Sequence, residues 1–150
     1  MPDIMHLLKI NAPPERVYAA LTTADGIRNW WTREAALDAT TGMFSFYGGR
    51  VVTRVSVETL EPPHRVGWRT TASTAPGGWE NTTITFDLRA EDGGAVLRFA
   101  HRGFAEENDG YARVTTGWAY FLISLKQYLE TGQGAPAPDV DFTCVVKRPG

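Results

Sequence analysis

The sequence predicts an α+β domain in which a curved antiparallel β-sheet wraps around one long C-terminal helix. Several segments between residues 32 and 102 alternate apolar and polar side chains and are separated by short turns. Residues 110–130 repeat apolar side chains at helical steps instead. The chain has 150 residues, the size of one globular domain. Strand follows strand without a helix between them, which excludes an architecture of repeated βαβ units.

The N-terminal region predicts one strand and two short helices. Residues 4–10 alternate apolar and polar side chains, as in a strand with one buried face. The Pro-Pro pair that follows ends this strand, because proline lacks the amide donor of a sheet ladder. Proline also suits the first turn of a helix, which we expect over residues 15–21. Thr23 can cap a second short helix over residues 26–31, which ends in two tryptophans.

The middle of the chain predicts an antiparallel meander with its apolar residues on one face. Each segment alternates with period two, and Gly-Gly pairs at 48–49 and 93–94 suit tight turns. Residues 74–78 are rich in glycine, proline and alanine and predict a loop. The predicted strands cover residues 42–47, 50–60, 65–71, 79–89 and 95–102.

The predicted C-terminal helix is the one element long and apolar enough to cover this face. Its apolar side chains recur at steps of three and four residues from Val114 to Leu129. At 1.5 Å per residue the helix is roughly 30 Å long, enough to lie across a whole sheet. Gly132 is well placed as its C-terminal cap.

The chain divides into one domain over residues 1–132 and a C-terminal segment over residues 133–150. Residues 133–138 contain two prolines and two alanines after a glycine and are typical of a linker. Residues 140–147 alternate in character and predict a terminal strand or a docked tail.

Composition and charge exclude several classes of protein. Fifteen basic and seventeen acidic side chains give a net charge of -2, without the basic excess of a nucleic-acid binder. No apolar run reaches the roughly eighteen residues of a membrane span, and the N-terminus lacks the pattern of a secretory signal. Cys144 is the single cysteine, which excludes an internal disulfide and fits a reducing compartment. We therefore expect a cytoplasmic protein with no membrane span and no nucleic-acid partner.

Several motifs, each loose alone, occur together in a characteristic order. They are residues 12–22 (APPERVYAALT), 30–31 (WW), 60–68 (LEPPHRVGW), 93–104 (GGAVLRFAHRGF) and 117–118 (GW). Over residues 4–132 the chain resembles the START-like (SRPBCC) superfamily, in the branch of activators of a heat-shock chaperone ATPase (AHSA-like). The resemblance implies a helix-grip fold, with an antiparallel sheet folded around the C-terminal helix over an apolar cavity.

The inward strand positions mix threonine with large rings, and Gly117 leaves space beside Trp118. A buried hydroxyl without a partner costs about 1–3 kcal/mol, so several inward threonines indicate a partly wet or ligand-filled interior. The alternatives are that threonine simply favours strands and that the rings form an ordinary core. The predicted ligand-binding residues are Trp31, Thr53, Val55, Trp68, Thr70, Thr82, Ile84, Phe86, Phe99, His101, Val114, Gly117, Trp118 and Phe121.

Histidine provides the one candidate for acid–base chemistry. His101 has inward parity at the end of a strand, and imidazole titrates near neutral pH. The alternative is a structural histidine, since no acid or nucleophile follows at a diagnostic spacing. His6 and His64 lie on separate segments from His101, so no metal site is expected.

These observations favour a binding module for a small apolar or amphipathic molecule, with no cofactor and no metal. The family resemblance implies a different class as an alternative, a chaperone-associated interaction protein. A third alternative is a cofactor-free cyclase or hydrolase that uses the same cavity, with His101 as its acid or base. The sequence is compatible with a monomer or with a homodimer formed through a sheet edge or the C-terminal tail.

Overall fold

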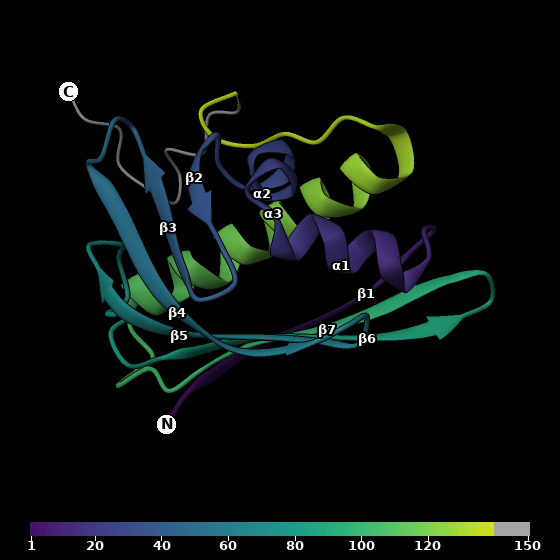
Figure 1. Cartoon of the computed structure of the whole chain (residues 1–150). Coiled ribbons are helices and arrows are strands. Elements are labelled where there is room, and N and C mark those ends of the chain that lie inside the picture. The colour runs from purple at the N-terminus through teal and green to yellow at the C-terminus, as the bar shows by residue number, and fades with distance from the viewer. Residues whose placement is uncertain (140–150) are drawn as a thin grey trace.

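The structure, a computed structural model, describes residues 1–139, which form seven strands and three helices (Figure 1). In chain order the elements are β1 (Asp3–Ile10), α1 (Pro14–Thr22), α2 (Ala24–Trp30), β2 (Glu34–Leu37), β3 (Thr41–Phe46), β4 (Val51–Glu61), β5 (Arg65–Ser73), β6 (Thr83–Glu91), β7 (Gly94–Arg102) and α3 (Asp109–Thr131).

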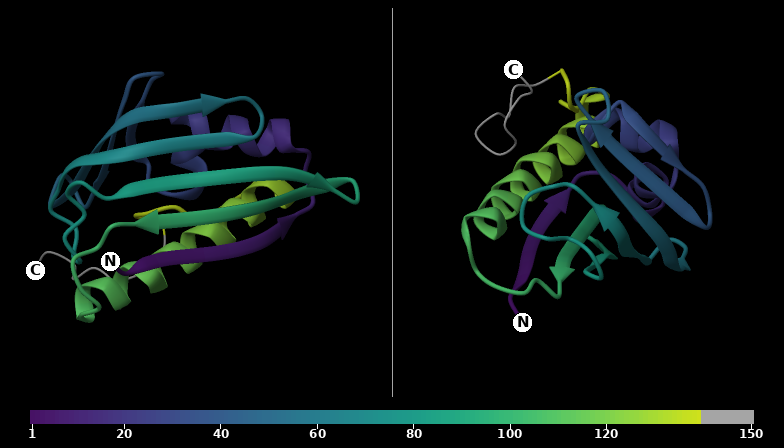
Figure 2. Two further views of the ribbon diagram at one scale, coloured as in Figure 1. Left: turned by 90° about the horizontal axis from the view of Figure 1, so that it is seen from below. Right: turned by 90° about the vertical axis from the view of Figure 1, so that its left-hand side faces the viewer.

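All seven strands form one antiparallel sheet in the order β1-β7-β6-β5-β4-β3-β2. The sheet bends around α3, and the three helices lie on its concave face (Figures 1 and 2). Two register shifts in the pairing of β4 with β5, at Arg54/Val55 and Val57/Thr59, accompany the bend. The predicted α+β helix-grip architecture is confirmed.

Strands β2 and β6 differ most from the predicted elements. Strand β2 was not predicted, because four residues are too few to show an alternation. Strand β6 begins at Thr83 rather than at residue 79. Residues 79–82 form a turn instead, in which the Thr82 amide donates to the Trp79 carbonyl at 3.0 Å and Asn81 has a φ of 65°.

The C-terminal helix extends one residue beyond the prediction at each end. The Asn108 side chain accepts a hydrogen bond from the Tyr111 amide and caps the first turn. At the other end Gly132 adopts a φ of 88°, and its amide donates to the Tyr128 carbonyl at 2.8 Å. The predicted glycine cap is confirmed.

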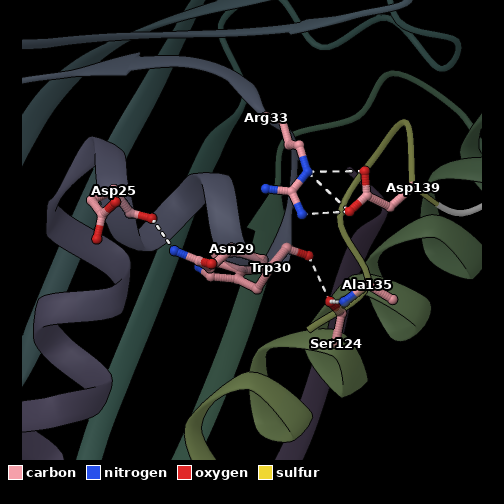
Figure 3. Close-up of polar contacts among 7 residues, drawn as sticks. All are labelled: Asp25, Asn29, Trp30, Arg33, Ser124, Ala135 and Asp139. Atoms are coloured by element: carbon pink, nitrogen blue, oxygen red, sulfur yellow. Dashed lines mark hydrogen bonds and ion pairs between the residues drawn. The ribbon is translucent and has the colours of Figure 1, made fainter. Parts of the chain in front are cut away.

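The segment after α3, which the sequence indicated to be a linker, is docked against the domain. Ala137 is 1% exposed and forms a parallel bridge with Thr32. Its amide donates to the Trp31 carbonyl, and its carbonyl accepts from the Arg33 amide, both at 2.9 Å. Arg33 also forms an ion pair with Asp139 at 2.5 Å (Figure 3). The predicted tail at 140–147 lies outside the described residues.

A buried hydroxyl joins this segment to two helices (Figure 3). Ser124 of α3 donates to the Trp30 carbonyl at 2.8 Å and accepts from the Ala135 amide at 2.7 Å. Gly134 must be glycine, because a Cβ there would lie 2.3 Å from the Asn29 carbonyl oxygen. The end of α2, the middle of α3 and the docked segment are thus held together at one point.

We expect Ser124→Ala to lower the free energy of unfolding by about 1–3 kcal/mol, because it leaves a buried amide and a buried carbonyl without a partner. Thr131→Ala is a matched control, since its exposed hydroxyl bonds only to its own helix and segment. The control should change stability by less than about 0.5 kcal/mol. Urea unfolding of both variants measures this difference, and equal losses would contradict the bridging role of Ser124.

Aromatic rings fill most of the space between α3 and the sheet. Trp118 is central, with ring centroids 4.5 Å from Phe99, 4.9 Å from Trp31 and 6.0 Å from Trp79. Trp31 in turn lies 4.5 Å from Phe44. Such tilted and stacked pairs add stability beyond the area that they bury. The interior is therefore largely occupied by the protein's own side chains.

Candidate functional site

Among the residues that the structure describes, a small space remains between the first half of α3 and strands β3 and β4. Its volume is about 50 Å³. The described residues around it come from α3, the two strands, the end of α2 and the loop between β5 and β6, and none of these residues within 1–139 is charged. We call this space the Trp79 cavity, and it is lined by Trp31, Phe46, Val51, Thr53, Ala75, Pro76, Trp79, Val114, Gly117, Trp118 and Phe121.

The one hydroxyl among the described lining residues is satisfied by the protein itself. Thr53 is buried, and its hydroxyl forms a 2.8 Å hydrogen bond with the Ser73 hydroxyl on the neighbouring strand. The hydroxyl therefore does not require a polar group in the cavity. Gly117 contributes no side chain, which leaves room beside Trp118. A cavity of this kind favours apolar contents.

The loop over residues 74–82, here called the Trp79 loop, closes one side of the cavity. The Trp79 ring lies 4.7 Å from the His101 ring, edge to face, and the whole residue is 7% exposed. Its indole N–H donates to the Pro76 carbonyl of the same loop at 2.9 Å. The loop meets the start of α3 at two glycines, since a Cβ on Gly110 would lie 2.6 Å from the Gly77 nitrogen.

A buried histidine connects the Trp79 loop to α3. His101 is fully buried on β7, and its Nδ1 accepts a hydrogen bond from the Trp118 indole N–H at 3.0 Å. Because Nδ1 accepts, the neutral ring carries its proton on Nε2, which donates to the Thr82 hydroxyl at 2.8 Å. That hydroxyl donates to the Trp79 carbonyl at 2.5 Å. The chain of bonds runs from α3 through β7 to the loop.

Burial lowers the pKa of His101 to about 3, so the ring is neutral at neutral pH. Both ring nitrogens are occupied, and His101 contacts Trp79 and Trp118 of the lining from behind without lining the Trp79 cavity itself. The geometry therefore favours a positioning role for His101, which orients Trp118 and the Trp79 loop.

Residues 11–130 match the family model described as Activator of Hsp90 ATPase homolog 1-like protein, AHSA1. This match spans most of the chain. The chain belongs to the AHSA1 family. The START-like resemblance of the sequence motifs is thereby confirmed. Among curated proteins, no sequence matches the AHSA1-like chain.

Several solved structures share the fold of this chain, and one of them is also similar in sequence. The solution structure of the Aha1 dimer from Colwellia psychrerythraea is 38% identical, with a TM-score of 0.79, and the match covers 89% of this chain and 100% of that chain. MLL2253 from Mesorhizobium loti is 24% identical, with a TM-score of 0.76 and 86% and 97% coverage. SSP2350 from Staphylococcus saprophyticus is 20% identical, with a TM-score of 0.72 and 89% and 95% coverage. The last two show a shared fold only.

The structure places the predicted ligand-binding residues of this AHSA1-like chain in two groups. Six line the Trp79 cavity: Trp31, Thr53, Val114, Gly117, Trp118 and Phe121. Eight are buried in the surrounding core without lining it: Val55, Trp68, Thr70, Thr82, Ile84, Phe86, Phe99 and His101. Five lining residues were not predicted, namely Phe46, Val51, Ala75, Pro76 and Trp79. The glycine-rich loop before Trp79 was the available signal for three of them.

Neither a metal cluster nor a membrane-spanning helix occurs in the part of the chain that the structure describes. Within residues 1–139, no three His, Cys, Asp or Glu side chains lie close enough to hold a metal ion. No helix in this range is both long enough and apolar enough to cross a bilayer. The ring of His6 is half-buried against Phe99, with centroids 6.0 Å apart, and burial lowers its pKa.

Proposed function

We propose that this AHSA1-like chain binds a small, uncharged, flat apolar or weakly amphipathic molecule in the Trp79 cavity. The observation that carries the proposal is the lining, in which the residues within 1–139 are aromatic, aliphatic or threonine and none of them is charged. Ligand sites are typically such apolar concavities with a few polar groups. Within residues 1–139 the lining pairs no nucleophile with an activating base, which supports binding rather than catalysis.

The ligand must displace the Trp79 ring to enter. The cavity measures about 50 Å³, whereas an apolar cavity that holds benzene needs roughly 150 Å³. The ring is suited to displacement, because its indole N–H bonds to Pro76 within the same loop and can move with it. Gly77 and Gly78 both have positive φ values and provide backbone freedom in that loop. A flat ligand would then take the stacking position on Trp118.

Binding of indole and naphthalene, followed by calorimetry and by NMR shifts of the lining residues, tests the proposal. Gly117→Ala should weaken this binding about tenfold, because the methyl group occupies space in a cavity that is already tight.

Thr116→Ala is the matched control for this experiment. It changes the neighbouring, exposed position of the same helix and adds nothing to the cavity lining. Its affinity for indole should equal that of the wild type. An absence of saturable binding by either probe, or equal affinities of Gly117→Ala and wild type, would rule the proposal out.

A second candidate function is an interaction with a chaperone ATPase, and it is supported by the description of the family. Unchanged ATP hydrolysis by an Hsp90 chaperone on addition of this chain, together with no co-sedimentation, would reject it. A cytoplasmic location would fit this candidate function, and the single cysteine of the chain supports such a location. The Colwellia relative is described as a dimer, which supports a homodimer here.

A further inference from the structure

Strand β1 forms one edge of the sheet, and within residues 1–139 no other strand pairs with its outer side. Figure 2 shows β1 along the border of the sheet, with α3 running beside it. An open edge presents unpaired amides and carbonyls, and proteins usually protect such an edge with charge, proline or a covering element.

Helix α3 donates hydrogen bonds to two carbonyls of this edge. The Tyr111 hydroxyl donates to the Asp3 carbonyl at 2.7 Å, and the Lys126 ammonium donates to the Lys9 carbonyl at 2.9 Å. Both carbonyls therefore face away from β7. Alternate residues of an antiparallel ladder point the same way, so the amides and carbonyls of Met5 and Leu7 also face outward. These four groups lie between the two covered positions.

The side chains at the uncovered positions are also apolar and exposed. Met5 is 49% exposed and Leu7 is 60% exposed, on the convex face of the sheet. Exposed large side chains next to unpaired backbone are characteristic of a surface that another strand covers. The pattern along this face of β1 is Asp3, Met5, Leu7 and Lys9, with opposite charges at its two ends.

We propose that two copies of this chain pair antiparallel through β1, about a two-fold axis at His6. In this register Met5 lies opposite Leu7 of the second copy, and Asp3 lies opposite Lys9 of the second copy. The Met5 and Leu7 backbones of both copies then form four central hydrogen bonds. Registers centred on Met5 or Leu7 would instead place a charge opposite an apolar side chain. The pattern is self-complementary only about His6.

This inference names the surface for the homodimer proposed above and is independent of the Trp79 cavity. The resulting dimer has one continuous sheet that extends through both copies, as in β-strand addition. Cross-strand pairs of opposite charge stabilise such a ladder, whereas like charges destabilise it. Because the axis repeats each pair, one substitution changes two contacts in the dimer.

Sedimentation at a series of concentrations, with charge-exchange variants, tests the register. Asp3→Lys and Lys9→Asp should each weaken the dimer about tenfold, since each creates two like-charge pairs. The double variant should restore the wild-type dissociation constant. Within one copy Asp3 also accepts from the Gly103 amide at 3.1 Å. That contact is lost in the Asp3→Lys single variant and in the double variant alike. A tighter dimer in the double variant than in the single variant therefore reports the contact between copies.

Two further measurements distinguish the outcomes. Leu7→Lys should abolish dimers at concentrations where Leu60→Lys, at an exposed leucine of β4, leaves them intact. Hydrogen exchange at the Met5 and Leu7 amides should slow as concentration rises, while the Ile4 amide, which faces β7, should not change. A monomer at every concentration overturns both the homodimer and its interface. A dimer that survives Leu7→Lys, or one that the double variant fails to restore, overturns the β1 interface alone.

Discussion

Acidification from pH 7 to pH 3 is expected to lower the free energy of unfolding by about 4 kcal/mol through His101 alone. In the folded chain burial lowers the pKa of this ring to about 3, from an ordinary value of 6.5. The folded state therefore favours the neutral ring, and the unfolded state binds the proton first. The stabilisation is complete above pH 6.5 and is lost as the pH falls from 6.5 through 3.

Urea unfolding at half-unit pH intervals measures this loss in the wild type and in His101→Gln. The variant should be less stable at pH 7, because the Trp118 N–H and the Thr82 hydroxyl lose a buried partner. Its stability should nevertheless decline less steeply below pH 6.5. His64→Gln replaces an exposed histidine and should keep the wild-type slope. Parallel pH profiles for wild type and His101→Gln would show that His101 is not the titrating group.

Trp118→Ala should lower the free energy of unfolding by about 3–5 kcal/mol, among the largest losses expected for this chain. The ring is buried, contacts four other aromatic side chains and holds Nδ1 of His101 in its acceptor state. Tyr120→Ala is the control on the same helix, since Tyr120 is partly exposed and, among the aromatic residues within 1–139, its ring contacts only Phe121. The control should lose less than about 1 kcal/mol.

Trp118→Phe separates the hydrogen bond from the packing. It keeps most of the ring contacts and should cost about 1–3 kcal/mol, because His101 loses its donor. The double variant Trp118→Phe/His101→Gln should lose less stability than the sum of the two single losses. The difference should be about 1 kcal/mol or more, since both single variants break the same bond. Chemical unfolding of the four members of this cycle gives the coupling energy. Strict additivity would argue against the indole–imidazole bond.

The fold could be predicted because most of its elements are long enough to show a period. Residues 50–60 alternate over many positions, and 110–130 repeat over several helical turns, so few alternatives remain. Strand β2 has four residues and escaped detection for that reason. The docking of Ala137 was not predictable either, because its contacts depend on Trp31 and Arg33, which lie far away in the sequence.

The candidate site was predictable only in part. Parity along a strand shows that Thr53 and Thr70 both face inward, but not which of them borders unfilled space. That distinction depends on how rings from different elements fill the interior. Trp79 escaped prediction for another reason. The Trp79 ring points inward because residues 79–82 form a turn with a positive φ at Asn81. The alternation of a strand does not reveal such a turn.

The docked segment connects a buried residue, Trp31, to the exposed Asp139 through backbone hydrogen bonds at Ala137. The Ala137 amide is bonded to the carbonyl of Trp31, whose indole forms one wall of the cavity. A displacement of Ala137 would therefore act directly on that wall. Attachment at this segment is a poor choice for measuring binding, because the handle and the site share a backbone contact.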